Sequence, residues 1–166
     1  MLKPIKLREH LKAALPRIAQ NPELLKIFVL NGSVRCTATG TLSWEYSYTM
    51  QLQLLDWVDH PDSVMAPLLT WLQVHQHDLL ANPDRKGIRF DAEYLNAASM
   101  DLIIHLDLTE RVIARARQDV PGGITLTHVS DTPPSYLPMQ EHWELFVKGE
   151  KVAEWNFPPS HPGVQP

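Results

Sequence analysis

The stretch 41-TLSWEYSYTMQLQLLDW-57 decides the fold, because from Leu42 to Leu54 it alternates strictly between apolar and polar side chains. Successive side chains of a strand point to opposite faces, so this segment predicts one strand with an apolar and a polar face. Strands usually run about 5–6 residues, whereas this alternation lasts about 13. The apolar face carries Leu42, Trp44, Tyr46, Tyr48, Met50, Leu52 and Leu54, and the polar face carries Ser43, Glu45, Ser47, Thr49, Gln51 and Gln53.

Alternation also predicts strands at 88–94, at 100–108 and in a last hairpin with arms 143–147 and 151–155. Residues 109–117 continue the phase of 100–108, although a helical turn capped by Thr109 is the alternative. We favour one very long strand over 100–117, because Pro121-Gly122-Gly123 and the following ITLTHV predict a returning partner.

The segment 26–40 predicts a hairpin centred on Asn31-Gly32, because both positions tolerate positive φ. Its second arm places Cys36 on the apolar phase, so we expect a buried, inert thiol. This hairpin and the long strand then form an antiparallel meander.

Two helical regions complete the pattern. Residues 4–18 repeat leucine and isoleucine at helical spacing, with an end or kink near Ala14 before Pro16. Residues 60–80 predict one well-buried helix, which ends at Asn82-Pro83-Asp84. Together these elements predict a single α+β domain over residues 1–157. A mainly antiparallel sheet of long strands carries two helices on one face, with a C-terminal hairpin. The proline-rich residues 158–166 form a flexible tail.

Composition excludes several classes of protein. The 166 residues are 44% hydrophobic and 20% charged, which is typical of a globular chain. The net charge of −4 gives no basic footprint, so we expect no specific nucleic-acid binding. No window is long and apolar enough to predict a membrane span. A single cysteine allows no intramolecular disulfide, which favours a reducing cytoplasm.

Catalytic motifs are not found in the sequence. Gly122-Gly123 is not followed by the Lys-Ser/Thr of a phosphate loop, and there is no nucleophile elbow. His75 lies on the apolar stripe of its helix and predicts a core histidine. His105 lies between Asp101 and Asp107 on one strand face, which allows an acid–base or metal site but fits a solvated face better. We therefore expect no enzyme activity and no catalytic, cofactor-binding or metal-binding residues.

A run of blocks in order carries a family resemblance. The blocks are MLKPIKLREHLKAALP, NGSV, TGTLSWEYSYTMQL, DWVDHPDSVMAPLLTWLQVHQHDLLANPD, GIRFDAEYLN and DLIIHLDLTERV, followed more loosely by HWELFVKGEKVAEW. Over about residues 1–113 the chain resembles the tail completion protein R family of contractile-tailed Peduovirus (P-two-like) phages. Residues 117–142 depart most from that likeness.

The resemblance implies a phage or prophage structural protein, made in the host cytoplasm and carried in the virion tail. It implies a role late in tail assembly, capping the head-proximal end of the tube and sheath for head joining. Tube, sheath, another completion protein and head-joining proteins are the implied partners. Analogy with tail terminators of other phages implies a hexameric ring, and an assembly chaperone or adaptor outside the virion is the alternative. No cofactor is implied.

Residues for contacts with other proteins are expected at the sheet's polar face, the projecting strands and the last hairpin. The polar face from 43 to 53 has one charge, where a merely solvated face usually carries more Lys and Glu, so it suits a wet subunit contact or a ring lumen. Trp143 and Trp155 either contact a partner or pack on each other. The candidate interface residues are Glu45, Gln51, Gln53, Arg111, Arg115, Arg117, Trp143 and Trp155.

Overall fold

The computed structural model describes residues 1–36, 40–81, 86–96, 98–137 and 140–158. It confirms an α+β fold built on a mainly antiparallel sheet of long strands with a C-terminal hairpin. In chain order the elements are α1 (Lys3–Ala14), α2 (Pro16–Gln20), the 3-10 turn η1 (Pro22–Leu24), β1 (Leu25–Cys36), β2 (Trp44–Trp57), α3 (Asp62–His75), α4 (Asp78–Ala81), β3 (Ile88–Tyr94), β4 (Met100–Ala116), β5 (Ile124–His128), β6 (Glu141–Val147) and β7 (Glu150–Phe157).

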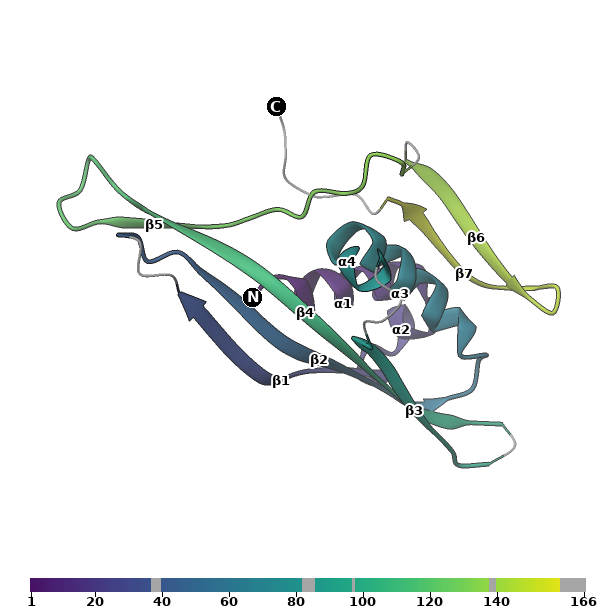
Figure 1. The fold of residues 1–166 in the computed structure, drawn as a ribbon. Coiled ribbons are helices and arrows are strands. Elements are labelled where there is room, and N and C mark those ends of the chain that lie inside the picture. The colour runs from purple at the N-terminus through teal and green to yellow at the C-terminus, as the bar shows by residue number, and fades with distance from the viewer. Residues whose placement is uncertain (37–39, 82–85, 97, 138–139, 159–166) are drawn as a thin grey trace.

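The main sheet has the strand order β1-β2-β4-β3, and β5 pairs with β4 beyond the end of β3. Every pairing in it is antiparallel. The helices lie on one face of this sheet, and the β6-β7 hairpin lies across the helices on their other side (Figure 1). The helical layer is therefore enclosed between the large sheet and the small one, which adds a partial third layer to the expected two.

Alternation in β2 and β4 builds the core. The inward residues of β2 from Tyr48 to Leu54 and those of β4 from Leu102 to Leu108 are 0–4% exposed. The helices supply Leu7, Leu11, Leu68 and Trp71 to the same cluster. The prediction of one strand through 109–117 is confirmed as far as Ala116, because β4 is unbroken over 17 residues.

The predicted hairpin at Asn31-Gly32 is wrong. Residues 25–36 form the single strand β1, which pairs with β2 along its length, and the register shifts between Leu30 and Ser33. Asn31 has φ of 52°, so the dipeptide supplies its left-handed residue to a bulge instead of a turn. A bulge and a tight turn use the same local conformation, and only the pairing partner distinguishes them.

The long helix predicted over 60–80 is also corrected. It divides into α3 and α4 because Gln76 leaves the helix and bonds the sheet. The first helical region divides at Pro16 into α1 and α2, with α1 ending at Ala14 as predicted. The described residues thus contain four α-helices where two were expected. The predicted stop at 82–84 lies outside the described residues, as does the tail apart from Pro158.

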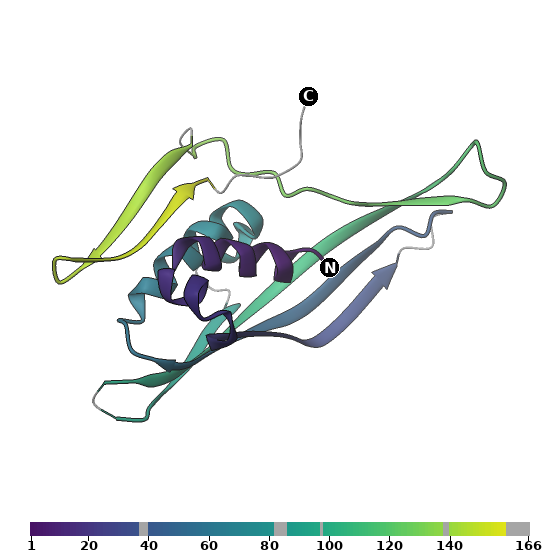
Figure 2. The ribbon, with the colours of Figure 1, turned by 180° about the vertical axis from the view of Figure 1, so that it is seen from behind.

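The sheet is much longer than the layer of helices. Figures 1 and 2 show the helices over one half, while the ends of β1, β2 and β4 project past them together with β5. We call this projection the arm and define it as residues 33–36, 44–46, 111–117 and 124–128. At the opposite end the β3-β4 hairpin projects as well (Figure 2). Cys36 lies in the arm and is exposed, so the prediction of a buried thiol is wrong because nothing described covers its face.

Candidate interaction surfaces and their anchoring network

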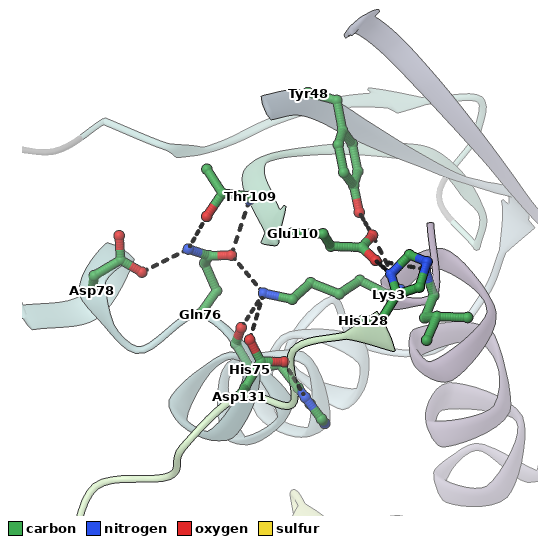
Figure 3. Close-up of polar contacts among 10 residues, drawn as sticks. Lys3, Tyr48, His75, Gln76, Asp78, Thr109, Glu110, His128 and Asp131 are labelled. Atoms are coloured by element: carbon green, nitrogen blue, oxygen red, sulfur yellow. Dashed lines mark hydrogen bonds and ion pairs between the residues drawn. The ribbon is translucent and has the colours of Figure 1, made fainter. Parts of the chain in front are cut away.

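A buried carboxylate fixes the chain's first residues on the sheet (Figure 3). Glu110 lies on the inward phase of β4 with its side chain 5% exposed. Its oxygens accept the backbone N–H groups of Leu2 at 2.6 Å and Lys3 at 3.3 Å, and the hydroxyl of Tyr48 at 2.5 Å. A negative charge at the start of α1 is favourable, because the first N–H groups of a helix lack partners within it.

A side chain completes the sheet between β3 and β5. On this edge of β4, Asp107 N–H donates to the Gly87 carbonyl, and Val129 N–H donates to the Arg111 carbonyl. Between them the Thr109 N–H donates to Gln76 Oε1 at 3.1 Å, and Gln76 Nε2 lies 3.3 Å from Thr109 Oγ1. The Gln76 amide thus takes the place of a neighbouring strand, which explains why the helix ends there.

Lys3 joins three parts of the molecule. Its ammonium is hydrogen-bonded to the His75 carbonyl at the end of α3 and to Gln76 Oε1 at 2.8 Å. It also forms an ion pair with Asp131 Oδ1 at 3.0 Å. Asp131 belongs to residues 129–137, the segment that joins β5 to the last hairpin and that we call the strap (Figure 1). His75 Nδ1 donates to Asp131 Oδ2 at 3.1 Å, so one carboxylate holds the strap on the helices.

Burial shapes the charges of this network. It lowers the pKa of Lys3, and the nearby Asp131 opposes that shift without cancelling it. Burial acts to raise the pKa of Asp131, but the hydrogen bond from His75 and the charge of Lys3 outweigh it, so the pKa is lowered. Burial, together with the bond to Glu110, raises the pKa of Tyr48. Lys3 and Asp131 therefore form a charged pair, and Tyr48 is a neutral donor.

An open polar cleft of ≈ 370 Å³ lies beside the network, between the end of α3 and the strap. Lys3, Gln76 and Asp131 line it and bond to one another there. We interpret the cleft as the seam between strap and helices. His75 is 3% exposed and stacks on Trp71 with ring centroids 4.4 Å apart, as predicted for a core histidine.

The helices do not extend over the outer part of the arm (Figures 1 and 2). On its inner face Val112 and Ala114 are buried, whereas apolar residues of the flanking strands β1 and β5 are exposed. Strand pairing places Val34 beside Tyr46, Cys36 beside Trp44, and Leu126 beside Ala114, all on the face that carries the core further along. Val34 is 62% exposed, Leu126 55% and Ile124 50%. A contiguous apolar face in water is typical of a site for contact with another protein.

Most of the predicted interface residues lie on the opposite, outer face of the sheet. Glu45 lies between Arg35 and Arg111 in one row across three strands, and Arg35 bonds it at 2.8 Å. Arg115 is exposed on the same face, whereas Arg117 at the end of the arm is bound to Asp119. Gln51 and Gln53 are half-buried over the body, opposite His105 and Ile103. These six residues thus divide into a charged group on the arm and an uncharged pair on the body.

The two tryptophans of the last hairpin pack on each other. Trp143 and Trp155 are register partners with ring centroids 6.2 Å apart, and Trp143 also lies 4.7 Å from the Phe157 ring. Trp155 is 6% exposed and belongs to the core, while Trp143 is 37% exposed. Packing across the hairpin is therefore present, and Trp143 is the member of the pair that another protein could reach.

The polar residues around His105 are engaged in structural contacts. Asp107 accepts two hydrogen bonds from Arg89, at 2.7 and 3.1 Å, and a third from Thr49 at 2.8 Å. Asp101 accepts the Asp56 N–H at 2.9 Å, and His105 Nε2 lies 3.9 Å from Asp91. The Arg89 hydrogen bonds lower the pKa of Asp107. The face is thus a solvated ion-pair surface, as the simpler interpretation of the sequence predicts.

One group of possible metal ligands lies on the last hairpin. His142, Glu144 and Glu154 have ligand atoms within 4.8 Å of one another. The ammonium of Lys151 lies 3.0 Å from Glu144 and 2.9 Å from Glu154, so it forms an ion pair with each carboxylate and offsets part of their negative charge. We interpret this group as an ion-pair cluster.

Sequence reasoning missed the anchoring network. One signal was available in the sequence. Glu110 places a charged group, and Tyr48 a hydroxyl group, at positions that alternate in phase with the apolar residues of their strands. Polar groups on such phases need buried partners. Gln76 and Asp131 gave no comparable signal, since their partners lie 33 and 128 residues away in the chain.

A long sheet with two projecting ends, one of them with exposed apolar side chains on its inner face, defines an α+β protein suited to contacts with other proteins. No helix in the described residues is long and apolar enough to cross a membrane. The family described as "P2 phage tail completion protein R (GpR)" matches residues 1–133, and the chain belongs to this family. It is 35% identical over 158 residues to "Tail completion protein R" of Escherichia phage P2, covering 94% of this chain and 99% of that protein. No solved structure matches the chain significantly.

Proposed function

We propose that this chain acts in phage tail completion. It caps the head-proximal end of the tail tube and sheath and prepares that end for joining to the head. It acts non-covalently, as a ring of copies seated on the last ring of the tail; analogy with terminators of other phages favours six. Family membership supports the role in tail completion. The observation that carries the mechanism is the arm, whose inner face exposes the apolar side chains of Val34, Ile124 and Leu126.

The arm suits capping because its surface can be buried against another protein without a rearrangement of the core. Its strands are prolongations of β2 and β4, so the paired backbone holds the apolar face rigid beyond the helices. Specific interfaces bury about 1,600 Å² in total, with an apolar centre and a polar rim. Val34, Ile124 and Leu126 supply such a centre, and the outer-face arginines supply a rim.

The test places a charge on the arm's inner face. Ile124→Asp and Leu126→Asp should leave folding intact, since both side chains are at least half exposed. Either change should abolish binding to tails that were assembled without this chain. Val58→Asp is the matched control, because Val58 is 46% exposed just after β2, at the end of the sheet opposite the arm. Electron microscopy of the tails and head joining in extracts are the measurements.

Four outcomes decide between the roles and test the arm. Overlong tails without the chain support a terminator, and tails of normal length that fail to join heads support a connector to the head. If the arm variants cap and join as the unchanged chain does, the arm does not carry the function. If mass spectrometry finds the chain missing from finished virions that needed it, the chain is an assembly chaperone and the capping proposal fails.

A further inference from the structure

The two outer edges of the main sheet are open. Within the described residues, β1 pairs only with β2, and β3 pairs only with β4. An open edge displays backbone N–H and C=O groups, and native proteins usually protect it with charges, prolines or short length. Of the 12 residues of β1, only Lys26 and Arg35 are charged, and none is proline. The bulge after Leu30 leaves Leu25–Leu30 as a regular open segment.

Apolar side chains accompany both edges. On β1, Phe28 is 43% exposed and Leu30 37%; on β3, Phe90 is 62% exposed and Tyr94 72%. A monomer gains nothing from leaving aromatic and aliphatic residues on an unpaired edge. Phe28 and Leu30 lie on the outer face, and Phe90 and Tyr94 lie on the inner face. Pairing with another strand would give side chains on each face cross-strand neighbours and would satisfy the free backbone groups.

The register aligns the two edges row by row. Leu25, Leu54, Leu102 and Ala92 form one row across the sheet. The next row consists of Lys26, Gln53, Ile103 and Asp91, and so places a lysine at one edge and an aspartate at the other. Both side chains lie on the outer face and are exposed.

Strand direction also fits. The path β1-β2-β4-β3 contains an even number of antiparallel strands, so β1 and β3 run in opposite directions. A second copy, rotated about an axis along the strands, would therefore bring its β3 antiparallel to β1 of the first. If the second copy is not shifted along the strands, its Asp91 lies opposite Lys26 of the first. A shift by two residues keeps the inner and outer faces matched and places Glu93 opposite Lys26 instead.

We propose that Lys26–Leu30 of β1 pairs antiparallel with β3 of a second copy of this chain, with Lys26 facing Asp91 or Glu93 across the junction. The contact is heterologous, and repeated by rotation it closes a ring with a continuous sheet. This inference rests on the ring in the proposed function and assigns its subunit contact.

Charge selects β3 over the other edges. In the described part of the chain Lys26 has no ion-pair partner and Glu93 none, while Asp91 has only the 3.9 Å approach of His105. A β1–β1 contact between copies would bring only basic charges together, which is unfavourable for directly opposed residues. The edge of β5 carries Thr125 and Thr127 and offers no charge to Lys26.

Reciprocal charge reversal tests the junction in the full-length chain. Lys26→Asp places like charges face to face in either register, whereas Asp91→Lys does so only without the slip and Glu93→Lys only with it. Lys26→Asp and one of the two lysine variants should therefore each weaken self-association about five-fold per contact. The chain that combines these two changes should recover, as should an equimolar mixture of the two single variants. Sedimentation, alone and with tail-tube subunits, measures association. Lys12→Asp and Glu9→Lys are matched controls on exposed helical positions.

The outcomes separate this contact from the function. Loss in Lys26→Asp and in one lysine variant, with recovery in the chain that combines them, supports the pairing. If the chain forms rings that none of the reversals weakens, the edge pairing is wrong while capping stands. If Lys26→Asp weakens association but neither Asp91→Lys nor Glu93→Lys does, β1 pairs with something other than β3, and the proposal is overturned. If the unchanged chain stays monomeric even with tube subunits and tails still fail to join heads, the ring and the contact are both rejected.

Discussion

Glu110 is the residue on which the start of the chain depends. Its carboxylate accepts two backbone N–H groups of α1 and the Tyr48 hydroxyl in a nearly water-free site. Replacing Glu110 by glutamine keeps the shape but turns an NH₂ group toward donors, so at least one buried donor loses its acceptor. We expect Glu110→Gln to lower the free energy of unfolding by about 1–3 kcal/mol.

Chemical denaturation measures that change, and hydrogen exchange should report faster opening of α1. Glu9→Gln is the control, because Glu9 is exposed and its loss of charge should change stability by less than about 0.5 kcal/mol. Equal effects of the two substitutions would contradict the anchoring role of Glu110.

His10 gives the fold a defined sensitivity to acid. Burial lowers the pKa of His10 to about 4, against the hydrogen bond to the Pro67 carbonyl that favours the charged ring. Above pH 6.5, the ordinary pKa of histidine, the ring is neutral in both the folded and the unfolded chain. As the pH falls from 6.5 to 4, the unfolded chain binds a proton that the folded chain excludes, so stability falls by about 3 kcal/mol in total.

The measurement is urea denaturation at intervals between pH 7 and 4. His10→Gln retains an N–H donor for Pro67 without a titrating group, so its stability should fall less over this window than that of the unchanged chain. Parallel curves for the two proteins would show that His10 is not the group responsible.

At the scale of elements, the strap depends on one carboxylate for its attachment. Asp131 bonds Lys3 and His75, and its replacement would leave the buried ammonium of Lys3 without its counter-ion. We expect Asp131→Asn to cost about 2–4 kcal/mol of unfolding free energy and to speed hydrogen exchange in residues 129–137. Asp119→Asn, at the exposed end of the arm, should leave exchange in the strap unchanged.

The strap variant also bears on acid stability in a different window. The pKa of Asp131 is lowered in the fold, so its contribution is present above the ordinary value of 3.8 and is lost as the pH falls through the lower folded value. The stability contributed by Asp131 is therefore lost at pH values below the range in which His10 acts. An Asp131→Asn protein whose stability stays parallel to the unchanged chain below pH 4 would contradict the assignment.

The elements that could be predicted from sequence are those whose pattern is local. Alternation located β2, β3, β4 and the last hairpin, because burial of one face imposes the period of two. It failed to identify which positions are covered: Phe90 and Cys36 are on apolar phases yet exposed, since Phe90 lies on the edge strand β3 and Cys36 lies in the arm. The bulge at Asn31 and the break at Gln76 depend on partners distant in the chain, which local propensity does not contain.

The same limit applies to the candidate surface. Alternation separated the two faces of the sheet, and it named the outer one for protein contacts because that face carries few charges. The structure adds that β4 extends past α1 and α3, so that the inner face of the arm exposes apolar side chains at its edges (Figure 1). Whether a face is buried is a property of the whole molecule, and the strand's own pattern is identical in either case.

For the whole molecule, the remaining question is which face of the sheet meets a neighbour. Gln51 and Gln53 lie on the outer face over the body, half-buried among neighbouring strands and opposite His105 and Ile103. Lysine fits at either position without disturbing the core, because the side chain points away from the helices. If the outer face forms a subunit contact, Gln51→Lys or Gln53→Lys should leave the unfolding curve within about 0.5 kcal/mol and hinder assembly on tails.

Thr127→Lys is the control, because Thr127 is an exposed outer-face position on the arm, away from the two glutamines. Negative-stain images of tails count the capped ends for each variant. Full capping by both glutamine variants, together with loss of capping in Leu126→Asp, would assign the contact to the inner face of the arm alone. Loss in Gln51→Lys and Gln53→Lys, with capping retained in Thr127→Lys, would mean that the ring also uses the outer face of the body, since an added charge is costly only where water is excluded.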